Sequence, residues 1–294
     1  MSQYQYGQQS SSGFIAAVTG TSTFGEITLA TVILLVILAL VYTAEGVYTG
    51  VSSFSERFQI LMDYTASSQD KALVIHQDAN KYPDAKILLP SENEPSGVEF
   101  AYSFFLYVNP ATFNSSGQEA LYHVWHKGYG CGWPLMGPGV FITGATNSLR
   151  VVMNTYENPY TYVDVTNIPI KKWFHVVLNC KKGGLEVHIN GNLANKLRFD
   201  KTLPYMNYQD IVLFSNANFV QSSTTPALGG TSLHVSGTFN GFMSQFIYAR
   251  YALSFTEIQS LFHGGPSKKL KTQTIELPPY LADTWWTTKY TSTG

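Results

Sequence analysis

The chain has 294 residues and a formal net charge of -1, with 18 Lys and Arg against 19 Asp and Glu. This balance lacks the basic excess of nucleic-acid-binding proteins, so we expect no nucleic-acid partner. Charged residues make up 13% of the chain, about half the usual share, while Tyr (19) and Phe (18) are numerous. This composition favours a β-rich protein that packs within an assembly over a freely diffusing one.

The N-terminal region combines a polar arm with an apolar run. Residues 1–25 are rich in Gln, Ser, Gly and Thr and have too few aliphatic side chains to build a core. The uncharged run Ile27 to Ala44 follows, and as a helix it would extend roughly 27 Å, close to the thickness of a bilayer's hydrocarbon core. We expect a transmembrane helix over residues 26–45. Its expected lipid-facing residues include Ile27, Val32, Leu35, Leu38 and Val41.

Two other interpretations of this run are a cleaved signal peptide and a buried soluble helix. A signal peptide normally has a basic segment before its apolar stretch, but residues 1–25 contain no Lys or Arg. A buried soluble helix would normally show a polar face. The sequence therefore predicts an uncleaved single-pass anchor with the lipid bilayer as a partner. Its orientation stays open, because Arg57 is the nearest basic residue to the run.

The connector over residues 46–94 is expected to contain a short helix and two strands. Phe54, Phe58 and Leu61 recur at helical spacing, which predicts an amphipathic helix over Ser53–Tyr64. A proline-containing loop then precedes the next domain. The expected strands are Ala72–His76 and Ala85–Leu89.

From Val98 onward the pattern is that of β-strands. Alternate residues of the first run, Phe100 to Val108, are large and apolar, which predicts that they share one buried face. Asn190-Gly191 between two alternating runs predicts a type I′ hairpin turn. The expected strands are residues 98–108, 148–154, 173–180, 185–189, 193–199, 211–214 and 239–250.

One helix is expected late in the chain. Ser254 followed by Glu257 forms a capping box, and Gly264 to Pro266 ends the helix. Residues 266–294 then form a tail. Many short strands, hairpin turns and a single short helix predict a mainly β protein, an antiparallel two-sheet sandwich.

Two segments resemble the laminin-G-like, concanavalin A-like jelly-roll superfamily. The first runs from Trp173-Phe-His175 to the Asn190-Gly191 hairpin, and the second runs from Phe239 into the late helix. The resemblance covers residues 95–265 and implies an antiparallel jelly roll with two sheets. The residues that carry it, expected in structural roles, are Trp173, His175, Asn190, Gly191, Gly241, Tyr248, Leu253 and Glu257.

The chain departs from the catalytic members of that superfamily. Glucanase-type members use clustered strand carboxylates as nucleophile and general acid, and no such cluster exists here. The nearest pair, Glu92 and Glu94, lies in a loop. Ser244 and Gln245 stand where many relatives carry acidic residues, which puts a calcium or sugar role of that strand in doubt. We expect no enzyme activity, no catalytic residues, no metal and no cofactor.

The histidines and cysteines also give no strong indication of a catalytic or metal-binding site. His123 and His126 flank Trp125, and on a regular strand their spacing would point the two rings to opposite faces, so a shared metal is not expected. His175 is expected to be a buried strand residue. Cys131 and Cys180 have no spacing typical of a zinc site, and a disulfide between them stays open.

Aromatic residues outside the expected core are the candidate recognition residues. Tyr129 and Trp133 lie in a glycine-rich loop, and Trp285 and Trp286 lie in the tail; aromatic side chains are favoured at binding hot spots. The alternatives are that Trp133 packs beneath its own loop and that the tail docks on the chain's own sandwich. The lysines at 268, 269 and 271 could contact anionic lipid or simply lead out of the domain.

These features predict a non-enzymatic, membrane-anchored structural or scaffolding protein whose jelly roll binds neighbouring structural proteins. Such anchored sandwiches resemble membrane-associated minor capsid proteins of large DNA viruses, which would place the chain at a virion's internal membrane. The alternative is a membrane-bound glycan-binding lectin or adhesion module. A glycanase is the least favoured hypothesis, because the carboxylate cluster is missing.

Overall fold

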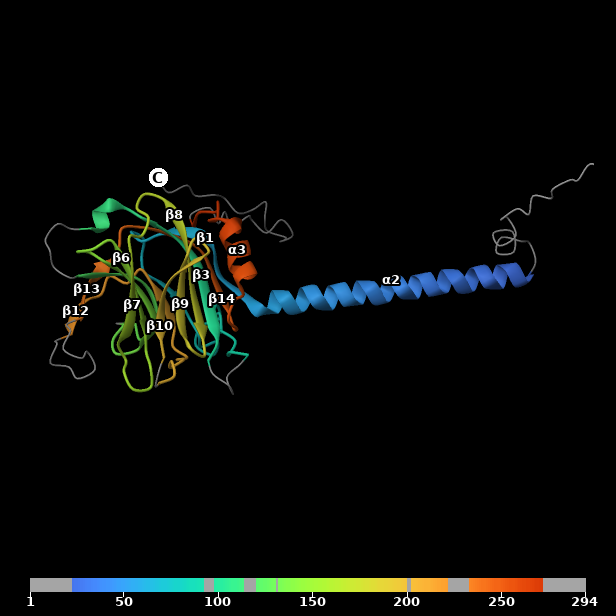
Figure 1. Cartoon of the computed structure of the whole chain (residues 1–294), viewed down its shortest axis with the longest axis horizontal. Helices are drawn as coiled ribbons and strands as arrows, with labels where there is room; N and C mark the ends of the chain where they lie inside the picture. Colours follow the sequence, from blue (N-terminus) through green and yellow to red (C-terminus); the bar gives the residue numbers. More distant parts are fainter. Residues whose placement is uncertain are drawn as a thin grey trace, which may run out of the picture. The chain divides into compact units, whose positions relative to one another are not determined.

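The computed structural model describes residues 23–92, 98–113, 120–130, 132–199, 202–221 and 233–271. The chain divides into two compact units, Met1–Glu56 and Arg57–Gly294. The first contains most of the helix α2, which runs from Thr23 to Arg57. The second contains the β-strands and the helix α3 (Figure 1).

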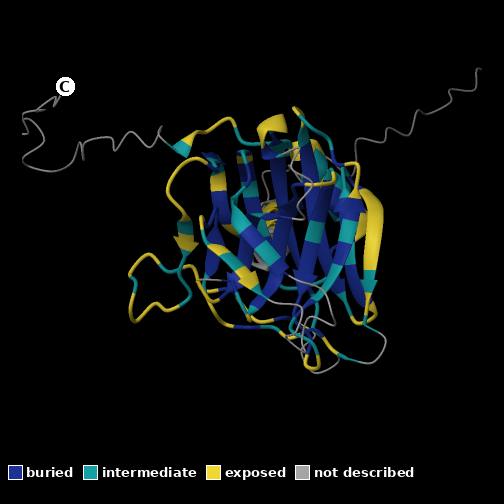
Figure 2. Cartoon of the chain, turned by 90° about the vertical axis from the view of Figure 1, so that its left-hand side faces the viewer, coloured by how far each residue is buried: buried dark blue, intermediate teal, exposed yellow. Residues whose placement is uncertain are grey.

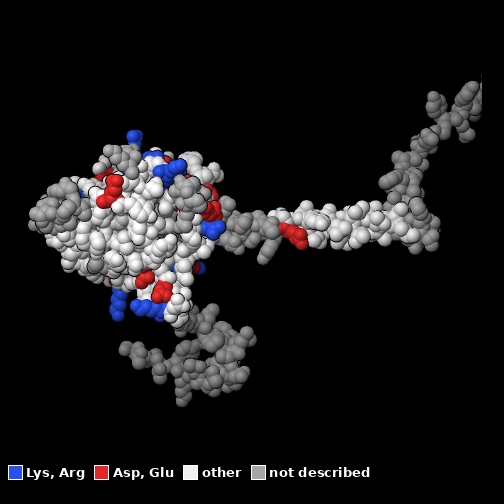
Figure 3. Space-filling model, turned by 90° about the horizontal axis from the view of Figure 1, so that it is seen from below, with Lys and Arg blue, Asp and Glu red and all other residues white. Residues whose placement is uncertain are grey.

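Helix α2 contains a stretch that is long and apolar enough to cross a membrane. Ile27–Val47 has 21 residues, a mean hydropathy of 2.6 and no part buried within the chain. The hydroxyls of Thr31 and Thr43 donate to the helix's own carbonyls, at 2.8 and 2.9 Å, as polar groups must in lipid. Figure 3 shows this stretch as almost free of charged side chains. The residues expected to face lipid are all exposed: Ile27, Val32, Leu35, Leu38 and Val41.

The second unit is a mainly β, two-sheet antiparallel sandwich, as predicted. The six-stranded sheet has the order β1-β14-β3-β8-β9-β10, and the larger sheet runs β12-β13-β4-β5-β6-β7, with β11 paired with β4 and β2 paired with β11. Only β13 with β4 forms a parallel pair among the paired strands of the described residues. The strands of the first sheet, in that order, are Phe58–Ser67, Gly241–Ala249, Phe100–Val108, Trp173–Lys181, Gly184–Ile189 and Asn192–Arg198. Those of the second are Asn218–Gln221, Leu233–Thr238, Leu121–Gly128, Met136–Thr143, Ser148–Met153 and Thr161–Thr166, with β11 at Ile211–Leu213 and β2 at Leu73–Ile75.

The main core lies between the two sheets. Trp125 of β4 is fully buried there, with its ring centroid 4.9 Å from those of Tyr102 and Phe246 on the opposite sheet. The predicted alternation of β3 is confirmed, since its apolar face from Phe100 to Val108 belongs to this core. Buried residues dominate the facing strands (Figure 2). Each large side chain buried in this way stabilises the fold by roughly 1.5–3 kcal/mol.

Helix α3 (Phe255–Gly264) packs on the outer face of the six-stranded sheet. Its predicted capping box is present, with the Ser254 side chain accepting from the Glu257 amide. Ile258 is buried against a small second core. Since β8 contributes to both cores, this strand is covered on both faces, as its apolar sequence predicts. The helix-side core consists of Ala101, Val177, Ala249, Leu253 and Ile258.

The prediction of a helix over Ser53–Tyr64 is wrong for the second half of that segment. Phe58–Ser67 is strand β1, which pairs with β14. Register shifts between Ile60 and Met62, and between Met62 and Thr65, interrupt the pairing. Such bulges break the alternation of buried residues, and the resulting spacing of apolar side chains imitates a helix.

The strand expected at Ala85–Leu89 is also wrong. This segment is extended, but glutamine side chains take the place of a neighbouring strand. The amide of Leu88 donates to Oε1 of Gln77, and the amide of Leu89 donates to Oε1 of Gln59, both at 2.9 Å. Polar side chains thus satisfy the backbone amides that a strand ladder would otherwise pair.

Candidate functional site

The outer face of the six-stranded sheet is only partly covered by α3. Along β3, Ala101 contacts the α3 core, and Ser103 and Phe105 are buried. Tyr107 and Asn109, farther along the same face, are half-buried. The ten-residue helix therefore leaves one end of this face open.

Three aromatic rings lie side by side on this open end. Phe242 of β14 is the register partner of Tyr107 of β3, which in turn pairs with Trp173 of β8. The ring centroids of Tyr107 and Phe242 are 6.0 Å apart, and those of Tyr107 and Trp173 are 5.6 Å apart. Phe242 is 36% exposed. Cross-strand pairing thus builds one continuous aromatic row.

The aromatic row forms part of a groove of about 350 Å³. The Nδ2 of Asn109 donates to Oδ1 of Asn240 at 2.6 Å, while its own Oδ1 accepts no hydrogen bond from the described residues. Among the described residues, none of the lining side chains is a carboxylate, amine, guanidinium or imidazole. They belong to Thr65, Tyr107, Asn109, Trp173, Phe242 and Leu270, and we call this set the aromatic groove.

Gly241 allows the close approach of β14 and β3 beside the groove. A Cβ atom at this position would lie 2.0 Å from the carbonyl oxygen of Tyr107, well inside van der Waals contact. A larger residue would push the strands apart and move Phe242 away from Tyr107. The neighbouring Asn240 is held by Thr112, whose Oγ1 donates to its carbonyl at 3.0 Å.

The segment after α3 forms the wall of the groove beside β1. The amide of Ser267 donates to Oγ of Ser244 at 2.8 Å, and the amide of Thr65 donates to the Lys269 carbonyl at 2.7 Å. We call residues 266–271 the strap. Leu270, which follows on the strap, is 48% exposed and lines the groove. The buried Ser244 thus anchors the strap.

His175 lies beneath α3, outside the groove. Its Nε2 is 2.8 Å from Oγ of Ser103, and its ring stacks on Phe262. Burial lowers the pKa of His175 to about 4, with His188 adding to the shift. The ring is therefore neutral at physiological pH and acts as a buried strand residue.

The other residues that carry the family resemblance connect elements of the fold. Asn190 and Gly191 have φ of 49° and 81°, the positive values that a type I′ turn requires, and Oδ1 of Asn190 accepts from the His175 amide at 2.9 Å. The Tyr248 hydroxyl donates to the Leu89 carbonyl at 2.9 Å. The Leu253 amide donates to Oδ1 of Asn179 at 2.9 Å.

The aromatic residues proposed from sequence for recognition lie elsewhere. Tyr129 is 48% exposed, whereas Trp133 is half-buried on the outer face of the larger sheet, 6.5 Å from Tyr160 between ring centroids. Trp285 and Trp286 fall outside the described residues. The aromatic groove was missed because strand register alone brings its three rings together, and no local motif marks that register.

The structure describes one of the two cysteines and one of the two candidate carboxylates. Cys180 is a free, buried thiol whose pKa burial raises well above its usual range. Cys131 lies outside the described residues, as does Glu94. Glu92 forms an ion pair with Arg250, with 3.0 Å between Oε1 and Nε. Within the described ranges, no three His, Cys, Asp or Glu side chains gather closely enough to hold a metal ion.

The prediction that His123 and His126 point to opposite faces is wrong. Nε2 of His123 lies 2.6 Å from Nδ1 of His126. A register shift between His123 and Trp125 in the β4–β5 pairing marks a bulge, and its extra residue brings both rings to one side. Burial lowers the pKa of both imidazoles.

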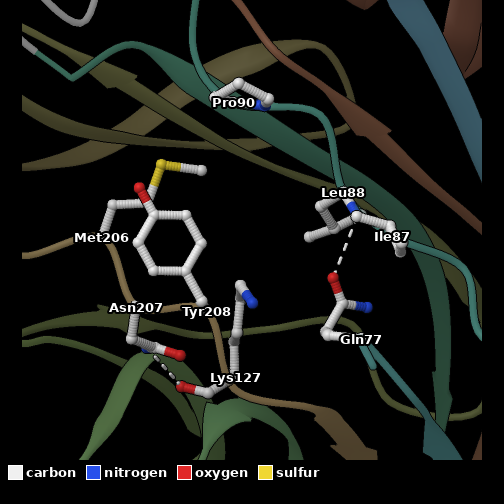
Figure 4. Close-up of a pocket in the computed structure, with 8 residues that line it drawn as sticks. All are labelled: Gln77, Ile87, Leu88, Pro90, Lys127, Met206, Asn207 and Tyr208. Atoms are coloured by element: carbon white, nitrogen blue, oxygen red, sulfur yellow. Dashed lines mark hydrogen bonds between the residues drawn. The ribbon is translucent and has the colours of Figure 1, made fainter. Parts of the chain in front are cut away.

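A smaller cavity of about 60 Å³ surrounds Lys127 (Figure 4). Lys127 is 3% exposed, and its Nζ donates to the Gln209 carbonyl at 2.6 Å. Burial lowers the pKa of this amine to about 8, against the opposing effect of Asp210. The cavity has room for a few water molecules but not for a sugar or a peptide side chain.

The comparisons with known proteins give distant structural matches only. No family model matches the chain, and no curated protein matches its sequence. Among solved structures, the botulinum neurotoxin serotype G binding domain has a TM-score of 0.48 at 13% identity, over 70% of this chain and 46% of that one.

Two further matches are structures with bound ligands. The serotype D ligand binding domain in complex with N-acetylneuraminic acid has a TM-score of 0.45 at 11% identity, over 70% of this chain and 45% of that one. The neurotoxin DC binding domain in complex with SialylT has a TM-score of 0.44 at 12% identity, over 70% and 46%. The chain thus spans less than half the length of these domains, and its two-sheet assignment rests on its own strand pairing.

Proposed function

We propose that the chain is a membrane-anchored, non-catalytic recognition protein. In this proposal, α2 fixes the chain to a bilayer, and the sandwich binds another molecule through the aromatic groove. The observation that carries it is the exposure of Ile27–Val47, 21 apolar residues with no part buried within the chain. An exposed apolar surface of this size calls for lipid or another partner.

The sandwich supports the proposal because its core is complete without this helix. The inter-sheet core draws its buried residues from Leu61 onward. The absence of a catalytic role is part of the proposal and is supported by the ion pairing of Glu92 with Arg250 and by the neutral, enclosed His175.

The scaffolding role in a virus remains a prediction from the sequence. Neither the fold nor the comparisons bear on it. A recognition role through the sandwich is favoured here because a specific surface, the aromatic groove, is open and uncharged.

Liposome flotation after an alkaline wash tests the anchor. The full chain should float with the vesicles, and N-terminal sequencing should recover residues ahead of α2. Leu35→Lys combined with Leu38→Lys should abolish flotation, because each lysine costs about 3 kcal/mol at the centre of a bilayer. Leu35→Ile combined with Leu38→Ile is the matched control and should float. A wild-type chain that stays with the aqueous fraction, or that is cleaved after α2, would overturn the proposal.

A further inference from the structure

We propose that the aromatic groove binds an uncharged oligosaccharide, with one pyranose ring stacked on Trp173 and Tyr107 contacting the next part of the ligand. This assignment rests on the proposed function and adds the chemical class of its ligand. It is argued from the groove's size, its lack of charge and the arrangement of its rings.

The size of the groove favours a small ligand over a protein. A stable protein partner covers about 800 Å² on each side, through roughly 20–30 residues. Six of the described residues line the aromatic groove, whose volume of about 350 Å³ is in the range of small-ligand sites.

The chemistry of the lining favours an uncharged ligand. Among the described residues, no carboxylate or cationic side chain lines the groove, so a sialylated, phosphorylated or sulfated group would lose hydration there without gaining an ion pair from them. An uncharged ligand avoids that cost. Asn109 is the amide among the lining residues, and its Oδ1 accepts from no described residue, so it leaves an acceptor for a ligand hydroxyl.

The row of rings matches the alternating surface of a sugar. A pyranose has an apolar C–H face and a rim of hydroxyls, so it buries the face on an aromatic ring while the rim stays hydrogen-bonded. Tyr107 lies between Phe242 and Trp173 at centroid distances of 6.0 and 5.6 Å. The Tyr107 ring plane is inclined by 64° to that of Phe242 and by 57° to that of Trp173, so successive sugar units would contact differently oriented rings along the row.

Isothermal titration calorimetry of the full chain tests the assignment. The chain should be held in phospholipid nanodiscs, because maltoside or glucoside detergents would compete for the groove. The probes are maltotetraose, cellotetraose and chitotetraose. We expect at least one of them to bind with a Kd of about 0.1–1 mM. Trp173→Ala and Tyr107→Ala should each weaken that binding about tenfold or more.

Two variants serve as controls for these losses. Trp173→Phe keeps a flat ring and should retain most of the affinity. Tyr156→Ala removes a tyrosine that is 70% exposed elsewhere on the sandwich and should leave binding unchanged. If Trp173→Ala fails to fold, Phe242→Ala replaces it, because this side chain is already 36% exposed, and it too should lose affinity.

Three results would overturn the assignment. One is that none of the three tetrasaccharides binds. Another is that binding survives substitution of the aromatic row. The third is that only a chain ending at Lys271 binds, which would make the C-terminal residues the occupant of the groove in the full chain. The flotation experiment tests the membrane anchor independently of the groove. A chain that floats but binds no sugar would therefore contradict only the proposed ligand class.

Discussion

Nε2 of His123 and Nδ1 of His126 lie 2.6 Å apart in the buried interior of the larger sheet. The amide of Ser215 donates to Nδ1 of His123 at 3.0 Å, so this ring carries its proton on Nε2 and donates to His126. His126 in turn uses Nε2 to donate to the Tyr129 carbonyl at 2.6 Å. Every ring nitrogen is satisfied only while both imidazoles are neutral.

Acid should therefore destabilise the sandwich. Burial lowers the pKa of His123, and also that of His126, below the unfolded value of 6.5. Below that pH the unfolded chain binds more protons than the folded chain. Stability is thus fully present above about pH 6.5 and is lost as the pH falls further, by up to about 1.4 kcal/mol per pH unit for each histidine. Urea denaturation at a series of pH values measures this slope.

Two variants separate the histidine pair from other groups. His126→Gln should reduce the acid slope, although His175 and His188, whose pKa values are also lowered, will keep part of it. His263→Gln alters an exposed residue of α3 and should leave the slope unchanged. Stability that is constant or rises between about pH 6.5 and pH 5 would contradict the neutral pair.

Gly241→Ala should destabilise the sandwich by about 3 kcal/mol. The added Cβ would meet the Tyr107 carbonyl at 2.0 Å, and two paired strands cannot separate there without loss of hydrogen bonds. Gly183→Ala is the matched control, because a Cβ at that position meets nothing within 4 Å. Chemical denaturation of both variants measures the difference. Equal stability of the two would show that β14 and β3 are not held this closely.

The strap should contribute to the stability of the sandwich. A chain that ends at Lys271 keeps the bonds from Ser267 to Ser244 and from Thr65 to Lys269. A chain that ends at Gly265 loses both and should be less stable by roughly 1–3 kcal/mol. Urea denaturation of the two truncations makes the comparison. If both truncations match the full chain in stability, the strap contributes nothing.

Cys180 should resist alkylation in the folded protein. Its side chain is buried, and burial raises the pKa of the thiol, so little thiolate is available to react. In a Cys131→Ser background, iodoacetamide should modify Cys180 only after denaturant is added. Mass spectrometry follows the modification. Rapid labelling under native conditions would show that the β8 core opens readily.

Much of the sandwich could be predicted because its strands follow simple rules. The alternation from Phe100 to Val108, the Asn190-Gly191 turn and the Ser254 capping box are local signals, and the structure has all three. The predictions from sequence fail where a side chain replaces a strand partner or where a bulge breaks the alternation of buried residues. Bulges made β1 resemble a helix, and Gln77 and Gln59 replaced a strand partner. Strand β5 (Met136–Thr143) was not predicted, because the glycines and the proline within it are untypical of a strand.

The aromatic groove could not be predicted from the same patterns. Tyr107, Trp173 and Phe242 are far apart in the sequence, and only the order β14-β3-β8 and its register place them in one row. Their exposure depends in turn on where α3 ends. The residues singled out for recognition, Tyr129 and Trp133, were chosen from a local glycine-rich loop, which is the kind of signal that a sequence shows directly.

Hydrogen–deuterium exchange of the full chain in phospholipid nanodiscs tests the membrane anchor most directly. The backbone amides of Ile27–Val47 should stay protected for hours, because water does not reach them in the hydrocarbon core. Rapid exchange throughout this stretch, together with a chain that leaves the nanodiscs and stays soluble without detergent, would contradict the account.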